Sequence, residues 1–246
     1  MRILAVDTAT MSCSVAVVDD GRLKAEITHA SGTTHARHLM TMVDMVLDLA
    51  GMSVRDVDGF AAVTGPGTFT GLRIGLSSVQ GMALAASRPV AGVTSLDVLS
   101  AQVAPVAPGH GSLVCALLDA RRKEVYYRFY RSHGREAVPM SDHRVGVPAA
   151  LAEEIKEPCT MVGNGVLQYE AVLMEKLGEH MVKAPSSAHT IRGETVARLA
   201  QAAFAENNMS PGGVLQPLYI RKSDAEINAS PKTAGKPVGR HVYRKD

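Results

Sequence analysis

Short apolar runs separated by turn residues dominate the first hundred residues and predict a sheet interrupted by helices. Strands are expected at 2–7, 13–18, 23–28, 60–63 and 89–93, and helices at 35–50 and 72–86. Asp20-Gly21 lies between the second and third runs and supplies the positive φ angles of a tight hairpin. Gly51 follows the first helical pattern as a stop signal. A strand meander followed by alternating helices and strands predicts an α/β fold.

A stretch containing Pro, Gly and His at 104–111 predicts a linker, because these residues neither continue a helix nor pair inside a sheet. Beyond it, strands are expected at 113–118, 124–130 and 160–163, with a turn at 119–122. The chain is thus expected to form two α/β halves, a domain of residues 1–105 and a smaller domain of residues 106–227. Residues 228–246 carry five basic residues and little apolar content, which predicts a flexible basic tail.

Composition narrows the class of protein. A hydrophobic content of 46% over 246 residues allows a core that needs neither metals nor disulfides. The 26 basic and 24 acidic residues nearly cancel, so any contact with RNA must be local. Cys13, Cys115 and Cys159 form no CxxC pair, and we expect them to be small buried residues in a reducing cytoplasm. The N-terminal apolar run is too short for a signal peptide, and no segment approaches the roughly 20 apolar residues of a membrane span.

The glycine-rich segment Gly65-Pro66-Gly67-Thr68-Phe69-Thr70-Gly71 precedes the second expected helix. Helix N-termini can bind phosphate through free N–H groups, but no Gly-Lys-Ser/Thr follows, so this is not a Walker A motif. The alternative is a tight turn that lets the helix pack closely. Candidate nucleotide contacts are Asp7, Thr8, Gly65 and Gly67; the alternative for Asp7 is a carboxylate that only caps a turn.

The two helical segments of the first half carry more apolar surface than a single stripe. Polar residues recur at Arg37, Thr41, Asp44 and Asp48, and apolar residues cover most of the remaining circumference. Either a partner protein or the chain's own sheet could cover the excess. The candidate partner-contact residues are Leu39, Met42, Val43, Val46, Leu72, Gly75, Leu76, Val79 and Ala83. His35 and His38 could share a helical face, but two histidines without a third ligand make a poor metal site.

Four segments together resemble the TsaB (YeaZ) family: MRILAVDTATMSCSVAVVDDG at 1–21, GPGTFTGLRIG at 65–75, DARRKEVYY at 119–127 and PLYIRK at 217–222. The resemblance covers roughly residues 1–227. It implies the actin-like, sugar-kinase-like fold, with two α/β domains of related topology, mixed sheets flanked by helices, and a truncated second domain. It also implies a cytoplasmic subunit of the machinery that attaches threonylcarbamoyl to adenosine 37 of tRNAs reading codons that begin with A.

The wider family includes a catalytic member, TsaD, whose active-site positions can be located in this chain. Met11 lies where that family carries a catalytic aspartate. Ser95 and Leu99 lie where it carries two metal-binding histidines, and Asp119-Ala120-Arg121-Arg122-Lys123 replaces a glycine-rich phosphate loop. The resemblance therefore implies a subunit without catalytic residues and without a metal.

The partners implied by the resemblance are a TsaD-type catalytic subunit, a TsaE-type ATPase, tRNA through the complex, and a second copy of the chain. Contact is expected through the helices of the N-terminal domain. No cofactor is firmly implied, and ATP or ADP at the complex or domain interface stays open. Two rival functions are a small-molecule kinase or ATPase that uses Asp7 and the Gly65 loop, and a metallopeptidase, which needs the missing histidine pair.

Overall fold

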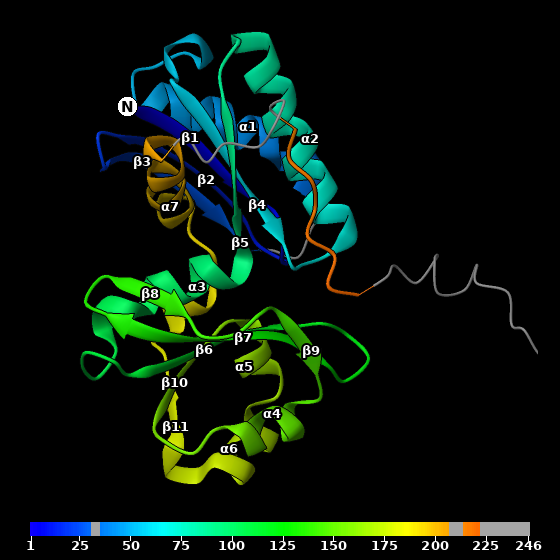
Figure 1. Ribbon diagram of the computed structural model, residues 1–246. Helices are drawn as coiled ribbons and strands as arrows, with labels where there is room; N and C mark the ends of the chain where they lie inside the picture. The colour runs from blue at the N-terminus through cyan, green and yellow to red at the C-terminus, as the bar shows by residue number, and fades with distance from the viewer. Residues whose placement is uncertain (31–34, 207–213, 222–246) are drawn as a thin grey trace, which may run out of the picture.

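The structure, a computed structural model, describes residues 1–30, 35–206 and 214–221 (Figure 1). It contains two sheets, one above the other in Figure 1, with helix α3 (Ser95–Val103) between them. Within these residues, no helix is long and apolar enough to cross a membrane.

The first sheet has the order β3-β2-β1-β4-β5. Its strands are β1 (Arg2–Asp7), β2 (Cys13–Asp19), β3 (Arg22–His29), β4 (Gly59–Gly65) and β5 (Val90–Thr94). β1, β2 and β3 pair antiparallel, whereas β1–β4 and β4–β5 pair parallel. Asp20 and Gly21 have φ angles of 47° and 74°, which confirms the predicted hairpin turn.

Helices cover both faces of the first sheet (Figure 1). α1 (His35–Leu49) and α2 (Phe69–Ala86) lie on one face, where Leu4 and Val6 of β1 join their core. α7 (Gly193–Ala205) lies on the other face, where Ile3 and Ala5 are buried. Alternating β1 side chains thus enter two different cores, which explains why the strand is a continuous apolar run. A short 3-10 helix, Val54–Asp56, precedes β4.

The second sheet has the order β11-β10-β6-β7-β8, and β9 pairs with β7. Its strands are β6 (Leu113–Asp119), β7 (Val125–His133), β8 (Glu136–Pro139), β9 (Arg144–Gly146), β10 (Cys159–Val162) and β11 (Met181–Lys183). Its helices are α4 (Pro148–Glu154), α5 (Asn164–Gln168) and α6 (Glu170–Leu177), with 3-10 turns at Ala104–Val106, Gly178–His180 and Ser186–His189. One core lies between β6, β7, β10 and these helices. The opposite face packs on α3.

The two halves share a core. Leu96 and Leu99 of α3 belong to the same buried cluster as Val114 and Leu118 of β6 and Val196 of α7. The predicted boundary near residue 105 separates the two sheets, but the first half is not contiguous in sequence, because α7 returns to the first sheet after the second is complete. The predicted tail, 228–246, lies outside the described residues.

Residues 214–221, named here the C-terminal strap, also return to the first half and then reach the second. Leu215 is buried in the core beneath α2, and the Leu218 N–H donates to Thr64 O at 2.8 Å. The Tyr219 ring stacks on Phe69 with centroids 4.8 Å apart. Arg221 donates to Glu124 Oε2 in the second half at 2.7 Å. The strap therefore links the two halves on the α2 side.

Candidate functional site

The turn after β1 carries the carboxylate that the sequence singled out. Asp7 is fully buried, and its Oδ1 accepts the N–H of Ala9 at 2.9 Å. Its Oδ2 has no hydrogen-bond partner among the described residues. Burial raises the pKa of the Asp7 carboxyl to about 7, although the N–H groups of Ala9 and Thr8 act in the opposite direction. Asp7 thus caps its turn, one of the two roles considered for it.

Glycines at the start of α2 let the helix touch this turn. A Cβ at Gly67 would lie 2.3 Å from Ala9 O, and one at Gly71 would lie 2.1 Å from Thr8 O. The Thr8 hydroxyl donates to Gly71 O at 2.8 Å, and the Thr68 N–H donates to Ala9 O at 2.7 Å. The space beside Thr8 is therefore filled by backbone of the same chain, as expected of a tight turn that allows close helix packing.

The four predicted nucleotide contacts do not form one ligand surface. Gly67 lines a cleft between the halves, whereas Asp7 and Thr8 are buried and do not line it. Gly65 is also buried, with Leu218 O only 2.9 Å from the position of a Cβ. The reason is that α2 and the C-terminal strap occupy the space that a ligand would need beside Thr8 and Gly65.

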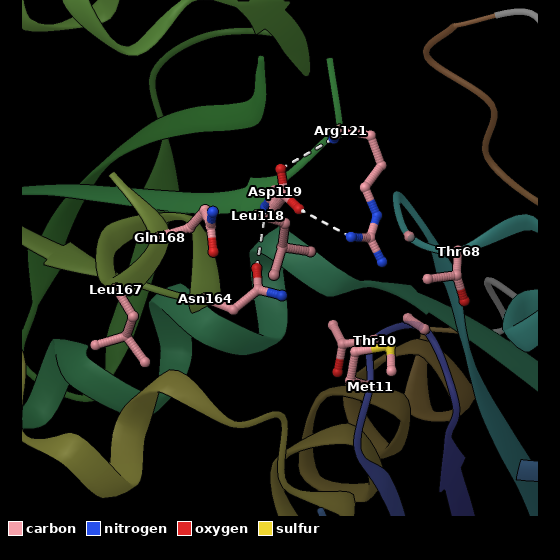
Figure 2. A pocket seen from close by; sticks show the side chains of 11 residues that line it. Thr10, Met11, Thr68, Leu118, Asp119, Arg121, Asn164, Leu167 and Gln168 are labelled. Carbon is pink, nitrogen blue, oxygen red and sulfur yellow. Dashed lines mark hydrogen bonds and ion pairs between the residues drawn. The ribbon is translucent and has the colours of Figure 1, made fainter. Parts of the chain in front are cut away.

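The cleft has a volume of about 370 Å³ and receives side chains from both halves (Figure 2). The first half contributes Ala9, Thr10, Met11, Gly67 and Thr68, and the second half contributes Leu118, Asp119, Arg121, Asn164, Leu167 and Gln168. Asn164 and Gln168 belong to α5, a helix of only five residues. Non-local packing alone brings them opposite Thr10 and Met11.

Asp119 organises the second-half wall of this cleft. Its N–H donates to Asn164 Oδ1 at 3.0 Å, and its Oδ1 accepts from the Arg121 N–H at 3.0 Å and the Tyr169 hydroxyl at 3.1 Å. Partial burial and the Asp119 carboxylate raise the pKa of Tyr169, which keeps that hydroxyl a donor. The Arg121 guanidinium lies 3.8 Å from Asp119 Oδ2 and is mostly exposed (Figure 2).

The turn between β6 and β7 has an unusual backbone. Arg121, Arg122 and Lys123 have φ angles of 61°, 54° and 63°, the left-handed region that favours glycine. The Ala120 N–H donates to Glu124 O at 2.9 Å and closes the turn. Three long cationic side chains therefore project from a segment whose backbone geometry glycine adopts more readily.

The positions aligned with the catalytic family's histidines have structural roles. The Ser95 hydroxyl is buried and donates to Pro66 O at 2.7 Å, and Leu99 is fully buried in the shared core. Among the residues that the structure describes, no three His, Cys, Asp or Glu side chains are grouped so as to hold a metal ion. The His35 side chain lies outside the described residues, and the His38 ring lies 5.1 Å from that of His29.

The three cysteines are free and buried, which confirms their predicted burial. Burial raises the pKa of the Cys13 and Cys159 thiols to about 12 and that of Cys115 well above its usual value. At neutral pH these thiols are uncharged, so they are poor nucleophiles.

The nine predicted partner-contact residues are core residues and need correction. Leu39, Met42, Val43, Val46, Leu72, Gly75, Leu76, Val79 and Ala83 are all buried within the chain. The reason is that the sheet under α1 and α2 takes both apolar stripes. The exposed large apolar side chains that the structure describes on these helices are Met40, Met45 and Leu49 on α1 and Phe69 and Leu84 on α2. Beside them, a hollow of about 440 Å³ is lined by Met40, Asp44, Met82 and Ala85 among others.

Two mixed sheets flanked by helices, with a cleft between the halves, place the chain in the actin-like, sugar-kinase-like fold class. Ethanolamine utilization protein EutJ from Carboxydothermus hydrogenoformans shares the fold at 11% identity, with a TM-score of 0.51 over 81% of this chain and 90% of that one. Within this class, the chain belongs to the TsaB (YeaZ) family.

Both sequence and structure comparisons support that family. The tRNA threonylcarbamoyladenosine biosynthesis protein TsaB of Escherichia coli K12 is 33% identical over 239 residues, which cover 92% of this chain and 96% of that protein. YeaZ from Pseudomonas aeruginosa is 31% identical with a TM-score of 0.73, over 89% of this chain and 100% of that one. The family described as TsaD, tRNA N6-adenosine threonylcarbamoyltransferase, matches residues 28–229.

Proposed function

We propose that this chain is a non-catalytic subunit in the biosynthesis of threonylcarbamoyladenosine in tRNA, and that it acts by pairing with a TsaD-type catalytic subunit. Likeness to the E. coli TsaB protein along nearly the whole chain carries the proposal. The blocked space beside Thr8 and the structural roles of Ser95 and Leu99 also support a non-catalytic role. A TsaE-type ATPase and tRNA would meet the chain through the complex.

The exposed α1–α2 face is the contact surface that we propose. Met45 is 51% exposed, Leu49 68% and Leu84 83%. The same two helices line the hollow of about 440 Å³, to which they contribute Met40 and Met82. Apolar side chains exposed together on neighbouring helices gain free energy when a partner covers them. The same face could pair two copies when the chain is alone.

The test is a titration of the chain against the TsaD-type protein of the same organism. Met45→Glu places a charge on the proposed surface, and we expect the dissociation constant to rise at least about tenfold, which corresponds to about 1.4 kcal/mol. Met174→Glu, at a 47% exposed position on α6, is the matched control and should bind like the wild type. If the folded Met45→Glu and Leu84→Glu variants both bind normally, the proposed surface is wrong.

Transfer of threonylcarbamoyl in the reconstituted complex tests the non-catalytic role. A Ser95→Ala or Asp119→Asn variant that still pairs with the catalytic subunit should support the wild-type transfer rate. A loss of transfer by orders of magnitude, with the complex intact, would instead indicate that this chain supplies a catalytic group.

A further inference from the structure

A second hollow lies between the halves, apart from the cleft of Figure 2, and we name it the lateral cleft. It has a volume of about 620 Å³, which is within the range of small-molecule sites. β5 and α7 line it from the first half, β8 lines it from the second, and α3 contributes Asp97 and Ala101. Its apolar surface includes Val93, Val138 and Leu199. Neither the cleft of Figure 2 nor the α1–α2 face includes these residues.

One wall of the lateral cleft carries a hydrogen-bonded polar network. Arg128 Nη1 donates to Asp97 Oδ1 at 2.9 Å, and Arg128 Nε donates to Ser141 O at 2.7 Å. The same Asp97 oxygen accepts the Tyr130 hydroxyl at 2.8 Å. Burial raises the pKa of Tyr130, so that its hydroxyl stays neutral. Because Arg128 and Asp97 form an ion pair, Arg128 is not the residue that we expect to bind an anionic ligand.

The other two arginines of the lateral cleft, Arg135 and Arg198, form no ion pair within the part of the chain that the structure describes. Arg198, half-buried on α7, makes a single hydrogen bond within the described residues, from Nη2 to Ala101 O at 3.4 Å. Arg135 is exposed in the turn between β7 and β8. Glu136 also lines the lateral cleft, but within the described residues its carboxylate forms no ion pair with Arg135 or Arg198. Both arginines also line an adjacent hollow of about 610 Å³, so they lie where the two hollows meet. A half-buried guanidinium with unused donors favours an anion.

We propose that the lateral cleft binds a small amphipathic anion. Its apolar body would contact Val93, Val138 and Leu199, and its carboxylate or phosphate group would bind the Arg198 guanidinium, with Arg135 at the rim. Because Leu199 belongs to the helix that packs on the first sheet and Val138 to the end strand of the second, the ligand would contact both halves at once. This inference is independent of the proposed role in tRNA modification.

The test uses the full chain and the fluorescent anion 1-anilinonaphthalene-8-sulfonate, with octanoate and octyl phosphate as competitors. We expect saturable binding at one site and displacement by at least one competitor, and the competitor that is effective identifies a carboxylate or a phosphate site. Arg198→Met keeps most of the apolar stem and removes the charge, so it should weaken binding at least about tenfold. Val138→Asp, at an exposed edge-strand position, should do the same by repelling the anion.

Arg55→Met is the matched control, because Arg55 is exposed and lies outside the lateral cleft. It should bind the probe like the wild type. Circular dichroism and thermal melting establish whether each variant is folded. If Arg198→Met does not fold, Val138→Asp and Arg135→Met are used for the test instead. A fluorescence signal that rises without saturation, or equal affinity in wild type, Arg198→Met and Val138→Asp, overturns the proposal.

Discussion

Arg221 donates from Nη1 to Glu124 Oε2 at 2.7 Å, and its Nη2 donates to Ala120 O at 2.9 Å. These two bonds join the last described residues to the turn that borders the cleft of Figure 2. The Leu218 N–H anchors the same strap to Thr64 O of β4. The relative position of the two halves therefore depends on a contact at the end of the described chain as well as on the shared core.

Loss of the Arg221 contact should loosen the strap. In Arg221→Met, one charge-assisted bond to Glu124 and one bond to Ala120 O are lost, and partial exposure of the pair limits the cost to about 1–2 kcal/mol in unfolding by urea. Hydrogen exchange at the Leu218 N–H should accelerate. Arg131→Met breaks a comparable pair with Glu157 inside the second half, and should leave exchange at Leu218 unchanged. Equal exchange in both variants would show that Arg221 does not hold the strap.

Asp7 should make the protein less stable as pH rises. Its folded pKa is about 7 and its unfolded value is near 3.8, so the folded state binds the extra proton between these values. The free energy of unfolding therefore falls as pH increases from about 4 to about 7 and levels off above, by at most about 4 kcal/mol. Asp7→Asn should remove this dependence, which chemical unfolding at several pH values would measure.

Asp58 offers a control of opposite sign. Hydrogen bonds from Arg2 lower the pKa of the Asp58 carboxyl, so its stabilising effect is present above its ordinary pKa and is lost as pH falls. The free energy of unfolding of the wild type minus that of Asp58→Asn should increase as pH rises through the acid range. If Asp7→Asn retains the full pH slope of the wild type, Asp7 is not the group responsible.

Two glycines of α2 should respond in opposite ways to the same substitution. A Cβ at Gly71 would lie 2.1 Å from the backbone oxygen of Thr8, so Gly71→Ala should cost about 3 kcal/mol through a forced backbone shift. Gly81 is exposed, and no described residue has an atom within 4 Å of the added carbon, so Gly81→Ala should stabilise by roughly 0.5–1 kcal/mol. Thermal unfolding of the two variants distinguishes them. A Gly71→Ala protein as stable as Gly81→Ala would show that the turn yields easily.

ATP should bind weakly to the isolated chain. The Thr8 hydroxyl and the Thr68 N–H are already paired within the protein, so few donors of the β1 turn are left for a triphosphate. We expect a dissociation constant above about 1 mM in equilibrium dialysis. Saturable binding at micromolar concentrations, weakened by Arg121→Met, would support the rival kinase or ATPase function and a nucleotide in the cleft of Figure 2.

Local patterns predicted individual strands of both sheets well. The predicted runs at 2–7, 13–18 and 113–118 match β1, β2 and β6 within one residue at either end, because each is apolar along its length and ends at a polar or turn residue. The second helix was predicted from 72 but begins at Phe69, after the N-cap residue Thr68. Gly71 in its first turn, together with Gly65 and Gly67 just before it, masked that start, since glycines also signal a loop.

The covering of the helices and the wall of the cleft could not be predicted from the sequence, because both depend on contacts between segments far apart in the chain. Periodicity indicated that Leu76 and Val79 face an apolar surface, but an apolar stripe is the same whether a sheet or another protein covers it. The wall of the cleft formed by Asn164 and Asp119 arises because β10 pairs with β6, a contact across forty residues of intervening chain. β8, β9 and β11 are three or four residues long, too short for a periodic signal.

The position of α7 has a consequence for synthesis on the ribosome. The side of β1 that carries Ile3 and Ala5 is covered by the last helix of the described chain, whose Val196 and Ala200 belong to the same core. A nascent chain that has released only its first hundred residues has a meander with one apolar side open to water. Closure of that side waits for translation to pass residue 205, so the protein is vulnerable to aggregation until its synthesis is nearly finished.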